Sequence, residues 1–176
     1  MRIAKNVEID APVDQVWEIV GPGFHRVGEW ATPVPHSEAK AGEPVHAEAP
    51  VAGRTCETTV SSFPALDERL SAYDEKGHSL TYEVVDGLPG FVSDAHNTWK
   101  LKPLGTSRTL VTLDGTIETR GIGRVMSPML RLQLNRAINQ SVDDLRIYAE
   151  TGEISERKQR SLAKLGIGAE PSPASG

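Results

Sequence analysis

The side chains best suited to proton transfer are the five histidines, at His25, His36, His46, His78 and His96. No two of them have the spacing of a zinc motif, so we expect no metal site. A neutral imidazole near pH 7 can act as an acid or a base. His25, in an expected short helix, and His96, in an expected strand, are therefore the candidate catalytic residues. The alternative is that both are structural.

Two carboxylates fall in the middle of expected strands, Glu57 and Asp114. A buried carboxylate is costly unless it is paired, so we expect Glu57 to face solvent. Alternation places Asp114 on the face opposite Leu113, unless a bulge at Gly115 turns it inward. Arg54 has two alternative partners, a ligand carboxylate or Glu57.

The single cysteine, Cys56, excludes an internal disulfide. No activating group accompanies it, so it is interpreted as a small strand residue. The chain has no nucleophile-elbow motif, no dinucleotide-binding glycine pattern and no phosphate-binding loop. We therefore expect no cofactor.

Three tryptophans make up a third of the nine aromatic residues. Trp17 is expected in the core. Trp30 and Trp99 either line a pocket or pack in the core, because an indole offers a flat apolar face and one N–H donor.

Composition limits the possible classes of partner. The chain has 176 residues, enough for one domain with a core, and 38 % are apolar but only 5 % aromatic, which leaves room for a cavity. A net charge of −5 makes nucleic acid an unexpected partner. No signal peptide and no apolar run long enough to span a membrane are present, so we expect a cytoplasmic protein, monomeric or homodimeric.

The elements that position these residues are mostly strands. Residues 3–9 alternate as a half-buried strand, and short helices are expected over 12–20 and 24–30. Further strands are expected over 34–39, 45–49, 54–62, 67–74, 79–85, 91–101 and 108–119. The last two are joined by a tight turn and should form an antiparallel hairpin.

A long amphipathic helix is predicted over residues 128–151, with Ser127 as its N-cap and Pro128 at its first position. Its inward stripe comprises Leu130, Leu134, Ala137, Ser141, Leu145 and Tyr148. Gln133, Gln140 and Asp144 line one edge of the stripe. After Gly152, residues 154–165 suggest a short surface helix, and residues 170–176 have the composition of a disordered tail.

This order of elements predicts an α+β fold in domain 1–151, followed by a charged extension over 152–176. A curved antiparallel sheet of about seven strands must cover its apolar face, and the long helix is the element able to do so. A sheet wrapped around one helix leaves a space between them. We expect that space to measure roughly 300–1,000 Å³.

Several segments resemble one known superfamily. They are IDAPVDQVW at residues 9–17, Trp30 followed by Pro33, DERLSAYDEKGHSLTYEV at 67–84, WKLKPLGTS at 99–107, and the final helix. Together they resemble the START-like or Bet v 1-like helix-grip superfamily, in its polyketide cyclase/dehydrase-type branch. The resemblance implies a deep cavity for a hydrophobic small molecule, such as a lipid, a polyketide or an aromatic compound.

Three hypotheses follow. The first is a protein that binds such a molecule, and the second is a polyketide cyclase or dehydratase that uses the same cavity. The third is an interaction module with residues 154–165 as its docking helix. The expected ligand-binding residues are Trp30, Arg54, Trp99, Leu130, Gln133, Leu134, Ala137, Gln140, Ser141 and Tyr148.

Overall fold

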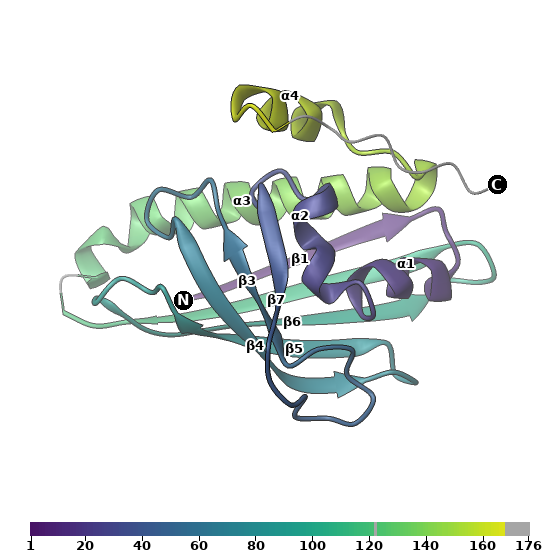
Figure 1. The fold of residues 1–176 in the computed structure, drawn as a ribbon, viewed down its shortest axis with the longest axis horizontal. Coiled ribbons are helices and arrows are strands. Elements are labelled where there is room, and N and C mark those ends of the chain that lie inside the picture. Colours follow the sequence, from purple (N-terminus) through teal and green to yellow (C-terminus); the bar gives the residue numbers. More distant parts are fainter. Residues whose placement is uncertain (122, 168–176) are drawn as a thin grey trace.

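The computed structural model describes residues 1–121 and 123–167. Its elements follow the order β1 (Arg2–Ile9), α1 (Val13–Val20), η1 (Phe24–Arg26), α2 (Val27–Trp30), β2 (His36–Lys40), β3 (Gly53–Glu57), β4 (Ala65–Asp74), β5 (Ser79–Asp86), β6 (Val92–Pro103), β7 (Thr109–Thr119), α3 (Gly123–Thr151) and α4 (Glu156–Lys164). Figure 1 shows the strands as one layer, with α3 lying along it.

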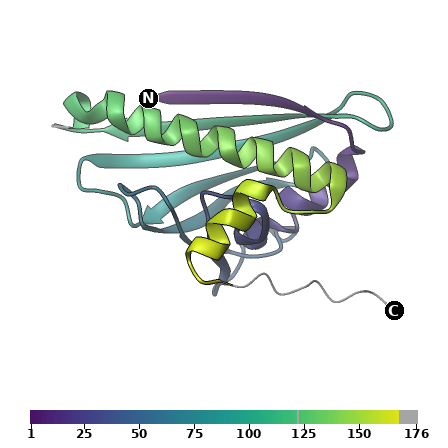
Figure 2. The same ribbon diagram turned by 90° about the horizontal axis from the view of Figure 1, so that it is seen from above.

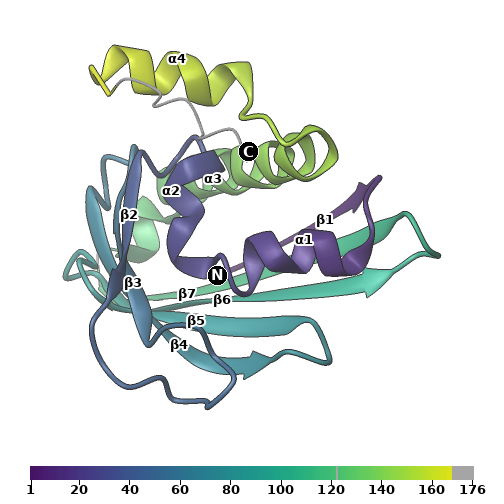
Figure 3. The same cartoon turned by 45° about the vertical axis from the view of Figure 1, so that its right-hand side comes forward.

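All strands belong to one seven-stranded antiparallel sheet, in the order β1-β7-β6-β5-β4-β3-β2. β6 and β7 form the long hairpin that the sequence predicts. The sheet curves so that β2 and β3 stand up beside α3 (Figure 3). The predicted α+β helix-grip architecture is therefore confirmed.

The long helix α3 crosses the sheet on the side where the short helices also lie (Figure 2). It begins at Gly123 and contains Pro128, so the predicted start at Pro128 with a Ser127 cap is wrong. Pro128 is the sixth residue of the helix, past the first four N–H groups that lack an intrahelical acceptor, so it removes one i→i−4 hydrogen bond from α3. The predicted end at Thr151 is confirmed, and Gly152 follows with φ +75°.

Two expected strands also differ. Residues 45–49 form no strand, because Pro44 and Pro50 flank them, and proline both lacks an N–H and restricts the residue before it. β3 ends at Glu57 instead of Ser62. Thr58 turns the chain there, accepting from Val60 and donating to the carbonyl of Phe63.

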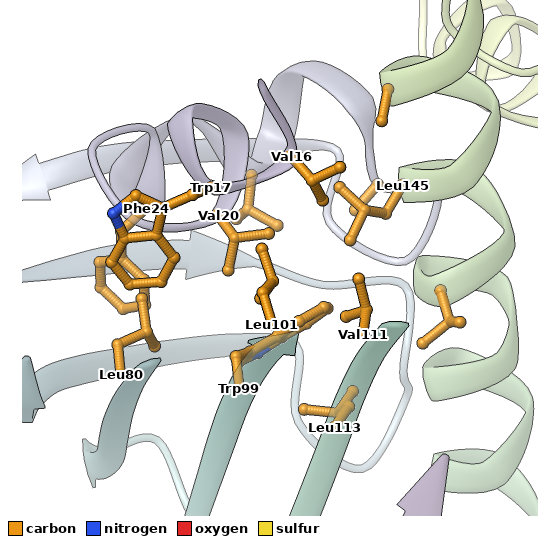
Figure 4. Packing of buried hydrophobic residues seen from close by; sticks show 14 of the residues in the cluster. Val16, Trp17, Val20, Phe24, Leu80, Trp99, Leu101, Val111, Leu113 and Leu145 are labelled. Atoms are coloured by element: carbon orange, nitrogen blue, oxygen red, sulfur yellow. The ribbon is translucent and has the colours of Figure 1, made fainter. Parts of the chain in front are cut away.

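The short helices close one end of the space under α3. On α1, Val16, Trp17 and Val20 are buried, and Trp17 thereby lies in the core as the sequence predicts. Figure 4 shows Val16 facing Leu145 of α3 and Val20 facing Leu101 of the sheet. This apolar packing fixes the helix relative to the sheet.

The C-terminal helix α4 packs back on the chain, above α3 and near α2 (Figure 3). Its N-cap is Ser155, whose Oγ accepts a hydrogen bond from the backbone N–H of Lys158. The tail over residues 170–176 lies outside the described residues. Among the helices described, none is long and apolar enough to cross a membrane.

Candidate functional site

A cavity of about 170 Å³ lies between the sheet, the short helices and α3. Its volume is smaller than the 300–1,000 Å³ expected from the sequence. Most of its wall is aliphatic or aromatic, with Phe24, Leu113 and Ile117 among the lining side chains. An apolar cavity of comparable size, about 150 Å³, stays dry and accepts a single benzene ring.

On the helix side, the wall is formed by Leu134, Ala137, Ile138 and Ser141 of α3. These positions are three or four residues apart, which places them on one face of the helix. Three of them belong to the predicted ligand-binding set.

Other helix residues from that set lie away from the cavity. Leu130 is buried in a separate apolar cluster with Phe63 and Val92. Gln133 accepts a hydrogen bond from Ser62 at 3.1 Å. Gln140 and Tyr148 are absent from the cavity wall as well. The apolar stripe is longer than the cavity, so its two ends serve packing.

On the sheet side, alternate residues of β6 reach the cavity: Ala95, Asn97 and Trp99. Asn97 is directly opposite Gly115 in the β6–β7 register. A Cβ atom at Gly115 would lie 2.6 Å from Oδ1 of Asn97, so glycine leaves room for this amide. Asn97 was missed by the sequence analysis, although its spacing of two from Trp99 places both on one face.

Neither of the candidate catalytic histidines, His25 and His96, is among the residues that line the cavity. His96 alternates with the inward residues of β6, so it faces outward, where its Nδ1 lies 3.0 Å from Oδ2 of Asp94. His25 is partly buried in η1, and burial, followed by the charge of Arg26, lowers its pKa.

The principal polar feature of the cavity wall is an ion pair between Arg54 of β3 and Glu68 of β4. Nε of Arg54 donates to Oε2 of Glu68 at 2.5 Å, and Nη1 donates to the carbonyl of Phe24 at 2.6 Å. The guanidinium also lies 4.0 Å from the ring centroid of Phe24 and 4.9 Å from that of Tyr82. Both charged side chains are buried.

The partner of Arg54 follows from the register of the sheet. Arg54 and Glu68 are directly opposite in the β3–β4 ladder, so their side chains share one face. Glu57 is exposed, three residues along the same strand and hence on the other face. The sequence alternative that paired Arg54 with Glu57 is therefore wrong.

Nearby titratable groups are held in their protonated forms. Burial raises the pKa of the Cys56 thiol to about 12, against the opposing effect of Arg54. Burial, and then the charge of Glu68, also raises the pKa of Tyr82. Burial by itself would lower the pKa of Arg54, but its interactions with Glu68, Cys56 and Tyr82 together more than offset that effect, so the pKa is raised and the guanidinium stays charged. Cys56 and Tyr82 therefore supply no anion at neutral pH, and the carboxylate of this cluster, Glu68, is paired with Arg54.

Two tryptophans lie on the cavity wall, Trp30 and Trp99, whereas Trp17 is in the core. The indole Nε1–H of Trp30 is buried and has no hydrogen-bond partner among the residues that the structure describes. A buried donor without a partner costs free energy.

Asp114 lies on the outer face of the sheet, where its carboxylate bonds Arg2. The register continues through Gly115 in both the β1–β7 and β6–β7 ladders, so no bulge turns it inward. Within residues 1–121 and 123–167, no group of three or more histidine, cysteine or acidic side chains is arranged to hold a metal ion.

A curved sheet that grips one long helix around an apolar cavity defines a helix-grip protein. The chain belongs to the family described as polyketide cyclase / dehydrase and lipid transport, whose model matches residues 1–150. No match was found among curated proteins.

Solved structures with the same fold include the protein XoxI from Bacillus cereus, with 19 % identity and a TM-score of 0.68, covering 88 % of this chain and 99 % of that one. The Zhui aromatase/cyclase from Streptomyces sp. R1128 has 16 % identity and a TM-score of 0.67, covering 88 % and 99 %. A START superfamily protein from Mycobacterium smegmatis has 15 % identity and a TM-score of 0.67, covering 86 % and 99 %. At these identities the likeness concerns the fold.

Proposed function

We propose that this protein binds a small hydrophobic molecule, of about the size of one aromatic ring, in the cavity between the sheet and α3. The observation that carries the proposal is the 170 Å³ cavity with its largely apolar wall. Its size favours an aromatic compound over a long lipid or an extended polyketide, which would need the walls to separate.

Two polar groups would orient the ligand. The unpartnered Nε1–H of Trp30 offers a donor, and the charged guanidinium of Arg54 offers a second. A ring that carries one carbonyl, hydroxyl or carboxylate oxygen matches this combination of apolar wall and donors.

A cyclase or dehydratase is the second candidate. It is favoured by the family description and by the aromatase/cyclase among the similar structures. The side chains of the cavity favour binding instead, because the carboxylate of the Arg54 cluster, Glu68, is already held by the guanidinium at 2.5 Å. Catalysis in this site would require a substrate that separates that pair.

Fluorobenzene provides a direct test, because it has the size of the cavity and a ¹⁹F signal. We expect saturable binding by ¹⁹F NMR and a rise in melting temperature with fluorobenzene concentration. Ala137→Trp, which places an indole in the cavity from α3, should abolish binding. Arg136→Trp, on the exposed neighbouring position, is the matched control and should bind normally. Equal binding by both variants would contradict this location.

Native mass spectrometry of the purified protein addresses the natural ligand. A small molecule that co-purifies with the wild type but not with the Ala137→Trp variant would be identified as the natural ligand. Product formation from a polyketide-like substrate, abolished by Glu68→Gln, would favour the cyclase instead.

A further inference from the structure

The helix α4 lies beyond the residues that match the family model, yet it makes buried contacts with the wall of the cavity. Lys158 of α4 is 0 % exposed. Its Nζ donates to the carbonyl oxygens of Ala31 at 3.0 Å and Val34 at 2.8 Å. These carbonyls belong to the connection between α2 and β2, and Trp30, Pro33 and Val34 of the same segment line the cavity.

A second set of contacts converges on Asp144 of α3, which is also 0 % exposed. Its Oδ2 accepts from the backbone N–H of Thr32 at 2.7 Å. Its Oδ1 accepts from Oγ of Ser155 at 2.6 Å and from Nη2 of Arg157 at 2.9 Å. One carboxylate thus joins α3, α4 and the wall segment.

These contacts couple the position of α4 to that of the wall. If α4 moved away, the carbonyl oxygens of Ala31 and Val34 would lose their hydrogen bonds from the Lys158 ammonium. Asp144 would lose the hydrogen bonds from Ser155 and Arg157 and would keep the one from the backbone N–H of Thr32. Buried polar groups that lose their partners require water, so the segment would be hydrated and less firmly held. Neither Lys158 nor Ser155 lines the cavity, so any effect on the ligand acts through the wall.

We propose that α4 is a strap that gates ligand exchange by holding residues 30–34 against the cavity. Lys158 and Ser155 are its positioning residues. When α4 is docked the wall is closed, and transient release of α4 lets a ligand enter or leave. The gate rests on the proposed function, since it presupposes that the cavity binds a small apolar molecule.

The test compares exchange rates in Lys158→Met and Arg160→Met, two variants of α4 that each remove one positive charge. Arg160 is a suitable control because its side chain is 73 % exposed and pairs only with Glu156 among the described contacts. With fluorobenzene and ¹⁹F exchange spectroscopy, Lys158→Met should raise the association and dissociation rates by the same factor, about fivefold or more. Its Kd should stay within about twofold of the wild type, because a gate changes both rates alike. Arg160→Met should match the wild type.

Hydrogen exchange gives a readout that needs no ligand. The amide of Thr32, bonded to Asp144, should exchange about tenfold faster in Lys158→Met than in the wild type or Arg160→Met. Should Lys158→Met fail to fold, Ser155→Ala removes one contact to Asp144 and should raise the same rates to a smaller degree.

Each outcome bears on one proposal. Unchanged Thr32 exchange and unchanged ligand rates in Lys158→Met would overturn the strap. A weaker Kd with an unchanged association rate would also overturn it, since that pattern describes a damaged cavity instead of an opened gate. Absence of fluorobenzene binding to the wild type would instead contradict the proposed function, and Thr32 exchange would still report whether α4 holds the wall.

Discussion

Cys56 shows how a strand environment sets the reactivity of a side chain. It lies on the cavity wall, 2 % exposed, beside the Arg54–Glu68 pair. Burial raises its pKa from 9.0 to about 12, which reduces the thiolate fraction near neutral pH about a thousandfold. The thiolate is the reactive form, so the position carries no nucleophile despite its place in the site.

This protonation state predicts slow alkylation. At pH 8 the native protein should react with iodoacetamide at least about a thousandfold more slowly than the urea-unfolded chain, as followed by mass spectrometry. The unfolded chain is the control for reagent activity. Labelling of the native protein at the unfolded rate would show that Cys56 is accessible and ionisable.

Lys158 gives a pH dependence with a definite sign. Burial lowers its pKa from 10.5 to about 8 in the folded protein, and the charge of Asp144 offsets only part of that effect. Between these values the unfolded chain keeps a proton that the folded protein has released, so this residue makes stability rise with pH. The neutral amine still has two N–H donors for its two carbonyl acceptors.

We therefore expect the stability difference between wild type and Lys158→Met to grow in favour of the wild type from pH 8 to 10.5, by at most about 1.4 kcal/mol per pH unit. Urea unfolding at several pH values measures it. Cys56 and the tyrosines titrate in both proteins, so they cancel in the difference. A difference that is constant with pH would mean that Lys158 keeps its ordinary pKa.

At the scale of elements, α3 has two kinds of inward position. Leu145 is 0 % exposed and packs against α1 and the sheet. Leu134 is only partly buried and faces the cavity. The same apolar stripe of α3 therefore packs in the core at one position and lines the cavity at another.

Truncating these two leucines should have unequal effects. Leu145→Ala should reduce the free energy of unfolding by about 2–5 kcal/mol, since it creates a void in a packed core. Leu134→Ala should reduce the free energy of unfolding by clearly less, because the Leu134 side chain already borders a void and loses fewer contacts. Urea unfolding of both variants measures the difference. Equal losses would indicate that the space next to Leu134 is filled.

The β3–β4 ladder places a charged pair inside the fold, with side chains each 8 % exposed. Glu68→Gln should destabilise the protein by about 3–5 kcal/mol, because it leaves the Arg54 charge buried without its counter-ion. The double variant Arg54→Met with Glu68→Leu should recover much of that loss. Thermal unfolding of the three proteins tests this. A double variant as unstable as Glu68→Gln would mean that the pair itself stabilises the sheet.

At the scale of the whole molecule, the extension after α3 contributes to the fold through α4. A chain that ends at Gly152 lacks the contacts from Ser155, Arg157 and Lys158 to Asp144 and the wall segment. It should melt several degrees lower than a chain that ends at Ile167, by differential scanning calorimetry. Identical melting points would show that α4 adds no stability.

The docking of α4 also bears on the interaction-module hypothesis. The sequence suggests a surface helix over residues 154–165, and its charged pattern alone is compatible with an external partner. In the structure, Ser155 and Lys158 are buried against the same chain. The face that carries them is therefore already occupied, which favours the small-molecule hypotheses.

Local patterns in the sequence predict most elements of the fold. Alternation predicts most strands, and the helical stripe from Leu134 to Leu145 predicts the face of α3 that meets the sheet. Trp17 as core and the outward direction of Asp114 follow from the same periodicities. These features depend on neighbours within a few residues, and such neighbours are visible in the sequence.

Only the tertiary structure decided the site. The pairing of Arg54 with Glu68 depends on strand register, and the absence of His25 and His96 from the cavity depends on where the wall ends. The burial of Asp144 and Lys158 depends on the return of α4 across α3, more than ten residues later in the chain. Periodicity determines which face of an element turns inward. Packing between segments that are distant in sequence then decides which residues of that face contact one another.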